Sequence, residues 1–168
     1  MNERYAFDRQ FKLFKGITFD YFAKLVPEET PAMDEPYLVF GRPEVLDYTS
    51  LVEIDGECRG CLYLTSPVPM LEDLLAINGE PDVSRRTLLD MCRELSNVLS
   101  GNASQAFGGH WEISVPKTLD AHDVEHLNLP DSTFVMPLRW REQRALLVVG
   151  LTPNNDSTSR SRLLGDAA

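Results

Sequence analysis

Three polar residues whose side chains could do chemistry, and a glycine, follow one another at helical spacing in the segment from Leu88 to Phe107. Asp90, Glu94, Asn97 and Gly101 are separated by four, three and four positions. At about 100° per residue they fall within about 60° of one another on a helix. The apolar residues gather on roughly the opposite side: Leu88, Cys92, Leu95, Leu99 and Ala106. The pattern predicts a helix that buries its Leu/Cys face and exposes an acid, an amide and a glycine.

A solvated helix face is the commonest explanation for such a polar stripe. Two of the four residues favour a different explanation. Asn97 and Gly101 are poor helix formers, and glycine costs about 1 kcal/mol relative to alanine inside a helix. A glycine on an exposed face also allows another surface to approach closely. These two positions therefore favour a face that contacts another molecule.

The series Asp90-x3-Glu94-x2-Asn97-x3-Gly101 resembles the signature of the CheX/CheC/FliY phosphatases of bacterial chemotaxis. That signature is Asp or Ser, three residues, Glu, two residues, Asn and a downstream Pro. The surroundings are also similar to CheX: a β-hairpin, a short helix, the motif helix, a strand that ends at Pro116, and a final hairpin. Pro116 lies closer to Asn97 than in the usual pattern, so we expect the following loop to differ.

The resemblance covers about residues 37–151, and one ExxN helix, where CheC has two, favours a CheX-like, single-site module. It implies an α+β fold of the CheC/CheX type, with long helices packed on one face of a largely antiparallel β-sheet. We expect a single domain over residues 1–152 and a flexible C-terminal tail over residues 153–168, which is rich in Ser, Thr, Asn and Asp.

The resemblance further implies a protein phosphatase that hydrolyses the phospho-aspartate of a CheY-like response-regulator receiver domain, in chemotaxis or another two-component pathway. Asn97 would orient the attacking water, and Glu94 would pair with a lysine of the receiver. Asp90 and Gly101 would contact the partner. No cofactor of the chain's own is implied, because the Mg²⁺ ion is expected in the receiver. A non-catalytic adaptor that binds receivers with the same fold is the alternative.

A more remote alternative is a zinc hydrolase. The stretch His122-Asp-Val-Glu125-His126 fits the metallopeptidase pattern H-x-x-E-H. A catalytic zinc site usually needs a third protein ligand, and no His or Cys follows His126. The polar composition and Pro130 predict a loop over residues 118–131, which is a poor setting for two histidines on one helix face.

The cysteines Cys58 and Cys61 form a CxxC stretch, which in a thioredoxin-like protein opens a helix after a strand. Here the stretch lies inside a β-like run, so we interpret both as ordinary strand cysteines. Zinc binding by four ligands is also disfavoured, because the chain has no second CxxC.

The net charge of −10 argues against nucleic acid or an anionic membrane surface as the main partner. The first residues lack the apolar core of a signal peptide, and no stretch reaches the roughly 20 apolar residues of a membrane span. We therefore expect a cytoplasmic protein. A homodimer that joins two sheets edge to edge is a further expectation taken from the resemblance. The last hairpin could supply that edge, and its Arg-rich strand end over residues 139–144 could equally be a solvated edge.

The remaining pattern predicts the elements around the motif helix. A helix over residues 18–25 is expected, preceded by a less regular segment that is interrupted near Gly16. Asp55-Gly56 predicts a hairpin, and Asp82 or Ser84 is the expected N-cap of the motif helix. The expected strands are 37–41, 45–54, 59–65, 111–115, 133–140 and 144–151, and the expected helices are 68–77 and 85–107.

Overall fold

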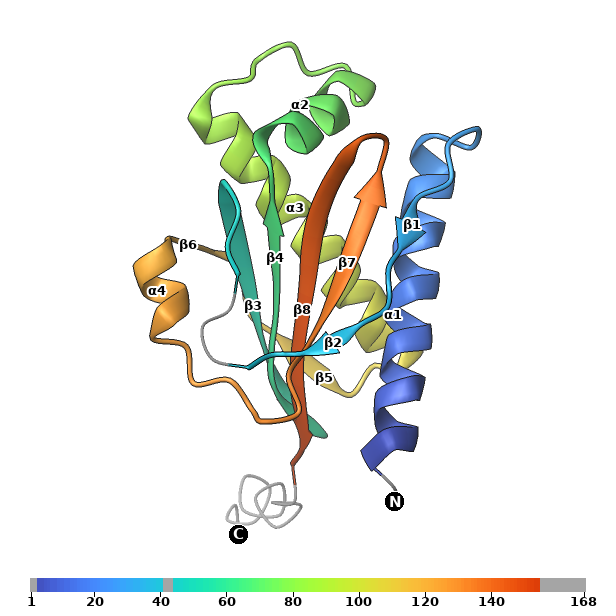
Figure 1. The fold of residues 1–168 in the computed structure, drawn as a ribbon, viewed down its shortest axis with the longest axis vertical. Coiled ribbons are helices and arrows are strands. Elements are labelled where there is room, and N and C mark those ends of the chain that lie inside the picture. Colours follow the sequence, from blue (N-terminus) through green and yellow to red (C-terminus); the bar gives the residue numbers. More distant parts are fainter. Residues whose placement is uncertain (1–2, 41–43, 155–168) are drawn as a thin grey trace, which may run out of the picture.

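The computed structural model describes residues 3–40 and 44–154, and Figure 1 shows their arrangement. The predicted tail lies outside the described residues from residue 155 onward. The elements in chain order are α1 (Glu3–Leu25), β1 (Ala32–Met33), β2 (Tyr37–Leu38), β3 (Tyr48–Gly56), β4 (Cys58–Ser66), α2 (Val68–Ile77), α3 (Arg85–Ala106), β5 (Trp111–Ile113), β6 (Lys117–Leu119), α4 (Ala121–Glu125), β7 (Phe134–Trp140) and β8 (Gln143–Pro153).

All the strands belong to one antiparallel sheet. Its order is β1-β7-β8-β4-β3-β5, with β2 also pairing with β7 and β6 with β3. The hairpin predicted at Asp55-Gly56 joins β3 to β4, with Ile54 opposite Gly60. Gly56 has a φ of 118°, a conformation that side chains disfavour. The predicted α+β fold with a largely antiparallel sheet is confirmed.

The two faces of the sheet contribute side chains to two different hydrophobic clusters. Alternate residues of the central strands, such as Val52, Leu62 and Leu147, join the large core under α1, α2 and α3. Their neighbours, such as Leu51 and Tyr63, face the other way and form a smaller cluster with Val124 of α4. Figure 1 shows α3 crossing one face of the sheet and α4 lying against the other. The long helices thus share one face, as predicted.

Helix α1 is longer than the sequence suggested, and the expected interruption near Gly16 is wrong. Gly16 is exposed, and a Cβ there would meet nothing within 4 Å. The helix therefore accepts a weak helix former at a cost of about 1 kcal/mol. Burial of Phe14 and Phe22 more than offsets that cost, since each large apolar side chain contributes about 1.5–3 kcal/mol.

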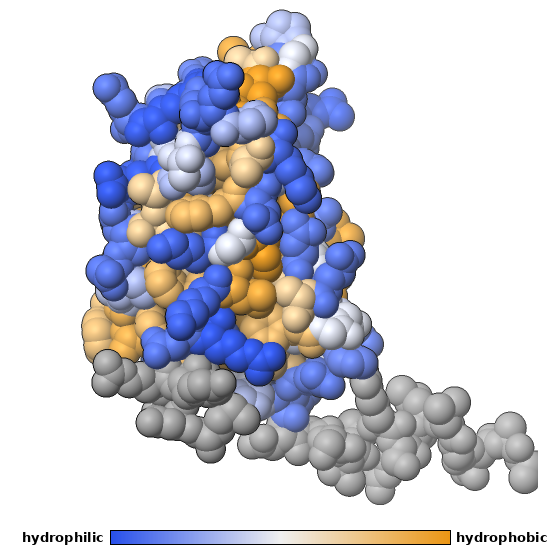
Figure 2. All heavy atoms as spheres, turned by 90° about the vertical axis from the view of Figure 1, so that its right-hand side faces the viewer, coloured by the Kyte–Doolittle hydropathy of each residue, from blue (hydrophilic) through white to orange (hydrophobic). Residues whose placement is uncertain are grey.

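The outer flank of α1 keeps aromatic rings half-buried. The Lys15 ammonium lies 5.9 Å from the ring centre of Phe11 and 5.5 Å from that of Phe19. Figure 2 shows apolar patches interleaved with hydrophilic side chains on the side of the molecule to which α1 belongs. The charged head of Lys15 thus reaches solvent while its stem covers apolar surface.

Helix α3 begins and ends where the sequence predicted. Ser84 is the N-cap, and its Oγ accepts a hydrogen bond from the Thr87 backbone N–H at 3.4 Å. Asp82 supports this cap by accepting from the Ser84 N–H at 2.9 Å and from the Thr87 hydroxyl at 2.6 Å. After Phe107, Gly108 turns the chain with a φ of 99°. The helix that carries the motif is therefore defined at both ends.

Two predicted boundaries are corrected by the structure. The expected loop over residues 118–131 contains β6 and α4, and α4 begins with a capping box between Asp120 and Asp123. Strand β3 begins at Tyr48 rather than at Val45, and Val45 packs, outside the strand, against the smaller cluster.

In the described residues the last hairpin has only a partly free edge, because short strands pair with part of β7, and the expected homodimer stays a prediction. Strand β8 pairs with β4 on one side and β7 on the other. Strand β7 is in turn covered by the short strands β1 and β2. In the described part of the chain, the outer strands of the sheet are β1 and β2 on one side and β5 and β6 on the other.

The cysteines occupy the strand positions that were predicted. Cys58 and Cys61 both lie in β4 and are not bonded to each other. Cys58 packs against the large core, whereas Cys61 joins the cluster on the opposite face. A CxxC pair split between two faces of a sheet is poorly placed for dithiol chemistry. Separately, no helix among the described residues is long and apolar enough to cross a membrane.

Candidate functional site on helix α3

The polar stripe of α3 lies where the wheel placed it. Asp90, Glu94 and Asn97 are exposed, and Gly101 is half-buried at the end of the stripe. All four belong to one uninterrupted helix, so the acid and the amide are a single turn apart on the same side. We refer to these four residues below as the α3 face. Their roles remain predictions, whereas their position on one side of α3 is a property of the fold.

The opposite side of α3 fixes which residues point outward. Leu88, Cys92, Leu95 and Leu99 are buried against the sheet and the neighbouring helices. Ala106, which the wheel placed with them, is instead exposed in the last turn. Burial raises the pKa of the Cys92 thiol to about 12, so this group stays protonated and apolar in character.

The two central side chains of the α3 face are available for an external partner. Within the part of the chain that the structure describes, the Asn97 carboxamide makes no hydrogen bond and the Glu94 carboxylate makes no ion pair. The Asn97 backbone carbonyl accepts a hydrogen bond from the Ser100 hydroxyl at 3.1 Å. The backbone of this turn is therefore braced, while the donor and acceptor of the Asn97 amide remain open.

Gly101 has no structural reason to be glycine that the described residues reveal. It lies inside a regular helix, and a Cβ at this position would meet nothing within 4 Å. Packing in the folded chain would therefore accept alanine, which is the better helix former by about 1 kcal/mol. The position is consistent with a surface that must approach the helix backbone closely.

Asp90 is the only member of the α3 face, among the described contacts, that has an internal ion-pair partner. It pairs with Arg93 three residues along the helix, and both side chains are about half exposed. Exposed pairs of this kind contribute little to stability. The pair does place a cation and an anion together at the edge of the exposed face.

Tyr21 of α1 flanks the α3 face, and no pattern in the sequence indicated it. Its ring is half-buried and meets the ring of Phe22 edge to face at 5.4 Å. Burial, followed by the nearby Glu94 carboxylate, raises the pKa of the Tyr21 hydroxyl to about 12. This hydroxyl is therefore neutral at physiological pH and adds no negative charge beside Glu94.

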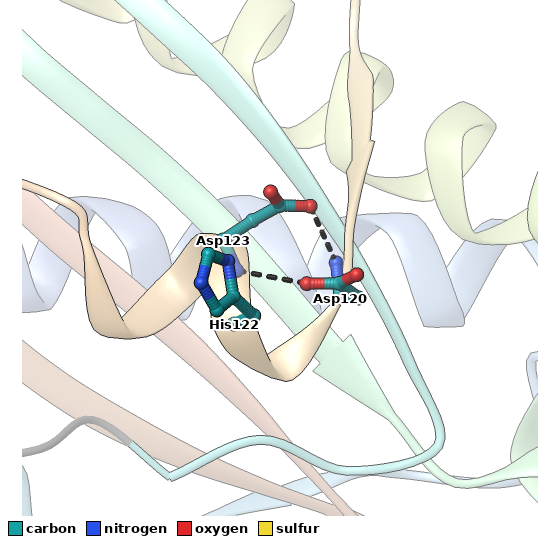
Figure 3. Close-up of side chains that lie close together, drawn as sticks. All are labelled: Asp120, His122 and Asp123. Atoms are coloured by element: carbon teal, nitrogen blue, oxygen red, sulfur yellow. Dashed lines mark hydrogen bonds between the residues drawn. The ribbon is translucent and has the colours of Figure 1, made fainter.

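The motif proposed for zinc does not form as a unit. His122 and Glu125 lie in α4, and His126 is its C-cap, with the two imidazole rings 4.3 Å apart. In the described residues, the ligand atoms that converge are those of Asp120, His122 and Asp123, all exposed and within 4.8 Å of one another (Figure 3).

The capping box explains the two carboxylates in that group. The Asp120 carboxylate accepts from the Asp123 N–H at 2.8 Å, and the Asp123 carboxylate accepts from the Asp120 N–H at 3.0 Å. The hydrogen bond from the Asp123 N–H lowers the pKa of the Asp120 carboxyl. The arrangement therefore serves to start α4, and it differs from the His122, Glu125 and His126 set that the sequence suggested.

Comparisons with known proteins agree with this fold. A family model described as "Chemotaxis phosphatase CheX" matches residues 48–137. A search of curated proteins finds no significant match. The similar solved structures include a putative chemotaxis protein from Desulfovibrio vulgaris Hildenborough, which is 17% identical with a TM-score of 0.71 and is matched over 84% of this chain and 95% of its own.

Two further structures show the same fold. The chemotaxis protein CheX from Desulfovibrio desulfuricans is 17% identical over 84% of this chain and 97% of its own, with a TM-score of 0.70. A CheX–CheY–BeF3–Mg²⁺ complex from Borrelia burgdorferi is 14% identical over 84% of this chain and 96% of the matched chain, with a TM-score of 0.66. At these identities the likeness concerns the fold.

Proposed function

Since the chain belongs to the CheX family of chemotaxis phosphatases, we propose that it hydrolyses the phospho-aspartate of a CheY-like response-regulator receiver domain. The observation that carries the proposal is the α3 face. Glu94 and Asn97 are exposed one turn apart on a regular helix. Among the described residues, the Asn97 carboxamide makes no hydrogen bond and the Glu94 carboxylate makes no ion pair. A convex helix face with these two groups suits a reaction whose substrate is another protein.

The reaction requires few catalytic groups from the phosphatase. A phospho-aspartate is an acyl phosphate, and its hydrolysis needs a water placed in line with the bond that breaks. The Asn97 carboxamide can accept a hydrogen bond from that water through its oxygen while its N–H₂ donates to a phosphoryl oxygen. It remains neutral throughout, so it does not repel the phosphoryl group. Orientation alone can supply several kcal/mol of catalysis.

Glu94 is assigned to docking rather than to proton transfer. Its carboxylate would pair with a lysine of the receiver and thereby set the register of the two proteins. Asp90 would support the docked face, and Gly101 would admit the partner close to the helix backbone. The Mg²⁺ ion belongs to the receiver in this proposal, and the chain contributes no cofactor.

The Borrelia burgdorferi relative supports the choice of partner, because that structure is a complex of CheX with CheY. The α3 face is preformed on a capped helix, so docking of a receiver needs no rearrangement of this helix. A cytoplasmic location and a homodimer are further parts of the proposal. If two sheets join, the outer strands β1 and β2 or β5 and β6 are the edges that remain for it.

The proposal is tested by phosphate release from phosphorylated receiver domains with and without the purified protein. We expect at least a tenfold faster release from a cognate receiver at catalytic amounts of the protein. Titration calorimetry on receivers that carry a stable phosphoryl mimic measures binding in parallel. Binding without faster release from any receiver would reject the phosphatase proposal and select the non-catalytic adaptor instead.

A further inference from the structure

The side of α3 that faces the sheet carries three buried serines at intervals of one turn. Ser96 and Ser100 are fully buried, and Ser104 is 7% exposed. Small residues at these positions let the helix lie close to the strands. Buried hydroxyls need partners, and the three serines find different ones. Among them, the hydroxyl of Ser96 lies within hydrogen-bond distance of a strand side chain.

Ser96 and Ser50 form a buried hydrogen bond between α3 and β3. Their hydroxyl oxygens are 2.8 Å apart, and both residues are fully buried. The Ser96 hydroxyl donates to the Arg93 carbonyl at 3.0 Å. Either hydroxyl can be the donor of the Ser50–Ser96 hydrogen bond. When Ser96 donates to the Arg93 carbonyl, Ser50 donates to Ser96.

A second polar contact lies one helical turn away. The Cys92 thiol lies within donating distance of two strand carbonyls, that of Tyr48 in β3 at 3.7 Å and that of Leu64 in β4 at 3.9 Å. Residues 92 and 96 of the helix are thus matched with residues 48 and 50 of the strand. The hydrophobic effect is non-directional, whereas a hydrogen bond needs its partner at a set distance and angle. Displacing a hydrogen-bonded hydroxyl from its partner leaves a buried polar group unsatisfied, which makes these contacts specify the register of α3 on β3.

This register contact lies directly behind the α3 face. Ser96 falls between Glu94 and Asn97 in the sequence and occupies the buried side of the same turn. Any sliding or rotation of this turn relative to β3 would also displace the Asn97 amide. An error of about 1 Å in the placement of a catalytic group can cost on the order of a hundredfold in rate.

We infer that Ser50 and Ser96 are positioning residues, whose buried hydrogen bond places the turn that carries Glu94 and Asn97 at the height and rotation needed for phosphoryl chemistry. This inference rests on the proposed function. Neither serine contacts the receiver, because both are enclosed by α3 and the sheet. The long Glu94 side chain can adapt its ion pair to a small shift, whereas in-line placement of a water cannot. Loss of the Ser50–Ser96 hydrogen bond should therefore lower kcat and leave the affinity for the receiver nearly unchanged.

The test compares Ser50→Ala, Ser96→Ala and the double variant, with Ser104→Ala as the matched control. Ser104 lies two turns from Ser96 on the same helix, is buried, and donates to the Trp111 carbonyl at 3.4 Å. The double variant removes both hydroxyls, so it leaves no buried group without its partner and should melt near the wild-type temperature. We expect its kcat to fall at least about tenfold, with its Kd for the receiver changed less than about twofold.

Ser104→Ala should keep the wild-type kcat. An active wild-type protein whose double variant retains full kcat, or whose Ser104→Ala variant loses as much kcat as Ser96→Ala, would overturn the positioning role alone. A wild-type protein that fails to accelerate phosphate release from any receiver would overturn the proposed function, and the positioning role with it.

Discussion

In the proposed mechanism, Glu94 contributes a negative charge for docking, and Asn97 contributes directed hydrogen bonds. The carboxylate of Glu94 is exposed, and its neighbour Tyr21 is neutral, so its charge is available to a cation on another protein. The amide of Asn97 carries no charge, and its value lies in directed hydrogen bonds. Substitutions at the two positions should consequently affect different steps.

Glu94→Gln keeps the shape of the side chain and removes its charge. Because a docked ion pair would be lost, we expect the Kd for the phosphorylated receiver to rise at least tenfold, which corresponds to about 1.4 kcal/mol. Titration calorimetry at two salt concentrations measures this, and the salt dependence of binding should also weaken. Glu72→Gln, at an exposed acid of α2, is the control. Equal affinities for Glu94→Gln and wild type would remove the ion pair from the mechanism.

The sequence was informative about the site because the four residues of the α3 face depend only on local helix geometry. Spacings of three and four positions on a well-capped helix determine which side chains share a side. Tyr21 and Ser50 escaped prediction for the opposite reason. They reach α3 through tertiary packing of α1 and β3, and nothing in the local pattern around either residue reports that contact.

Among the helices, the surroundings of two glycines can be compared directly. Gly16 in α1 and Gly101 in α3 both lie in helical backbone, and a Cβ at either would meet nothing within 4 Å. As far as folding is concerned they are equivalent. Only Gly101 belongs to the α3 face.

Gly16→Ala and Gly101→Ala should each raise the free energy of unfolding by about 0.5–1 kcal/mol, because alanine is the better helix former. Gly101→Ala should also weaken binding of the receiver, while Gly16→Ala should not. Chemical denaturation measures the first effect and titration calorimetry the second. Unchanged receiver binding by Gly101→Ala, or an equal loss by Gly16→Ala, would show that close approach at Gly101 is not needed.

Strong local signals decided which elements could be predicted. The predicted helix over 68–77 matches α2 at both ends, since Pro67 precedes it and Asn78-Gly79 follows. Strand β6 and helix α4 were missed because three and five residues are too few to show a period. Helix α1 continues through Gly16 because tertiary burial outweighs the weak local preference.

At the scale of the whole molecule, Arg141 links three parts of the fold that support the helical layer. It turns the β7–β8 hairpin with a φ of 54° and lies 4.5 Å over the ring of Trp140. Its guanidinium pairs with Glu29, after α1, at 2.8 Å and with Asp73 of α2 at 3.1 Å. These pairs raise the pKa of Arg141 further above its ordinary value and lower that of Glu29.

The arrangement of the sheet explains why α3 presents a fixed face. Its central strands are paired on both sides, and the long helices cover one face over a continuous core. Only long-range pairing places β7 and β8 inside the sheet, so the sequence could predict the hairpin but not its position. The receiver would therefore meet a preformed surface.

In the proposed mechanism, Asn97 orients the water that attacks the phosphoryl group. The most direct measurement is phosphate release from the cognate phosphorylated receiver in the presence of Asn97→Ala, with Asn102→Ala, an exposed asparagine of α3 outside the α3 face, as control. We predict that Asn97→Ala still folds and binds but lowers release at least a hundredfold toward the receiver's spontaneous rate, and that Asn102→Ala keeps wild-type activity. Release at the wild-type rate with Asn97→Ala would contradict the account.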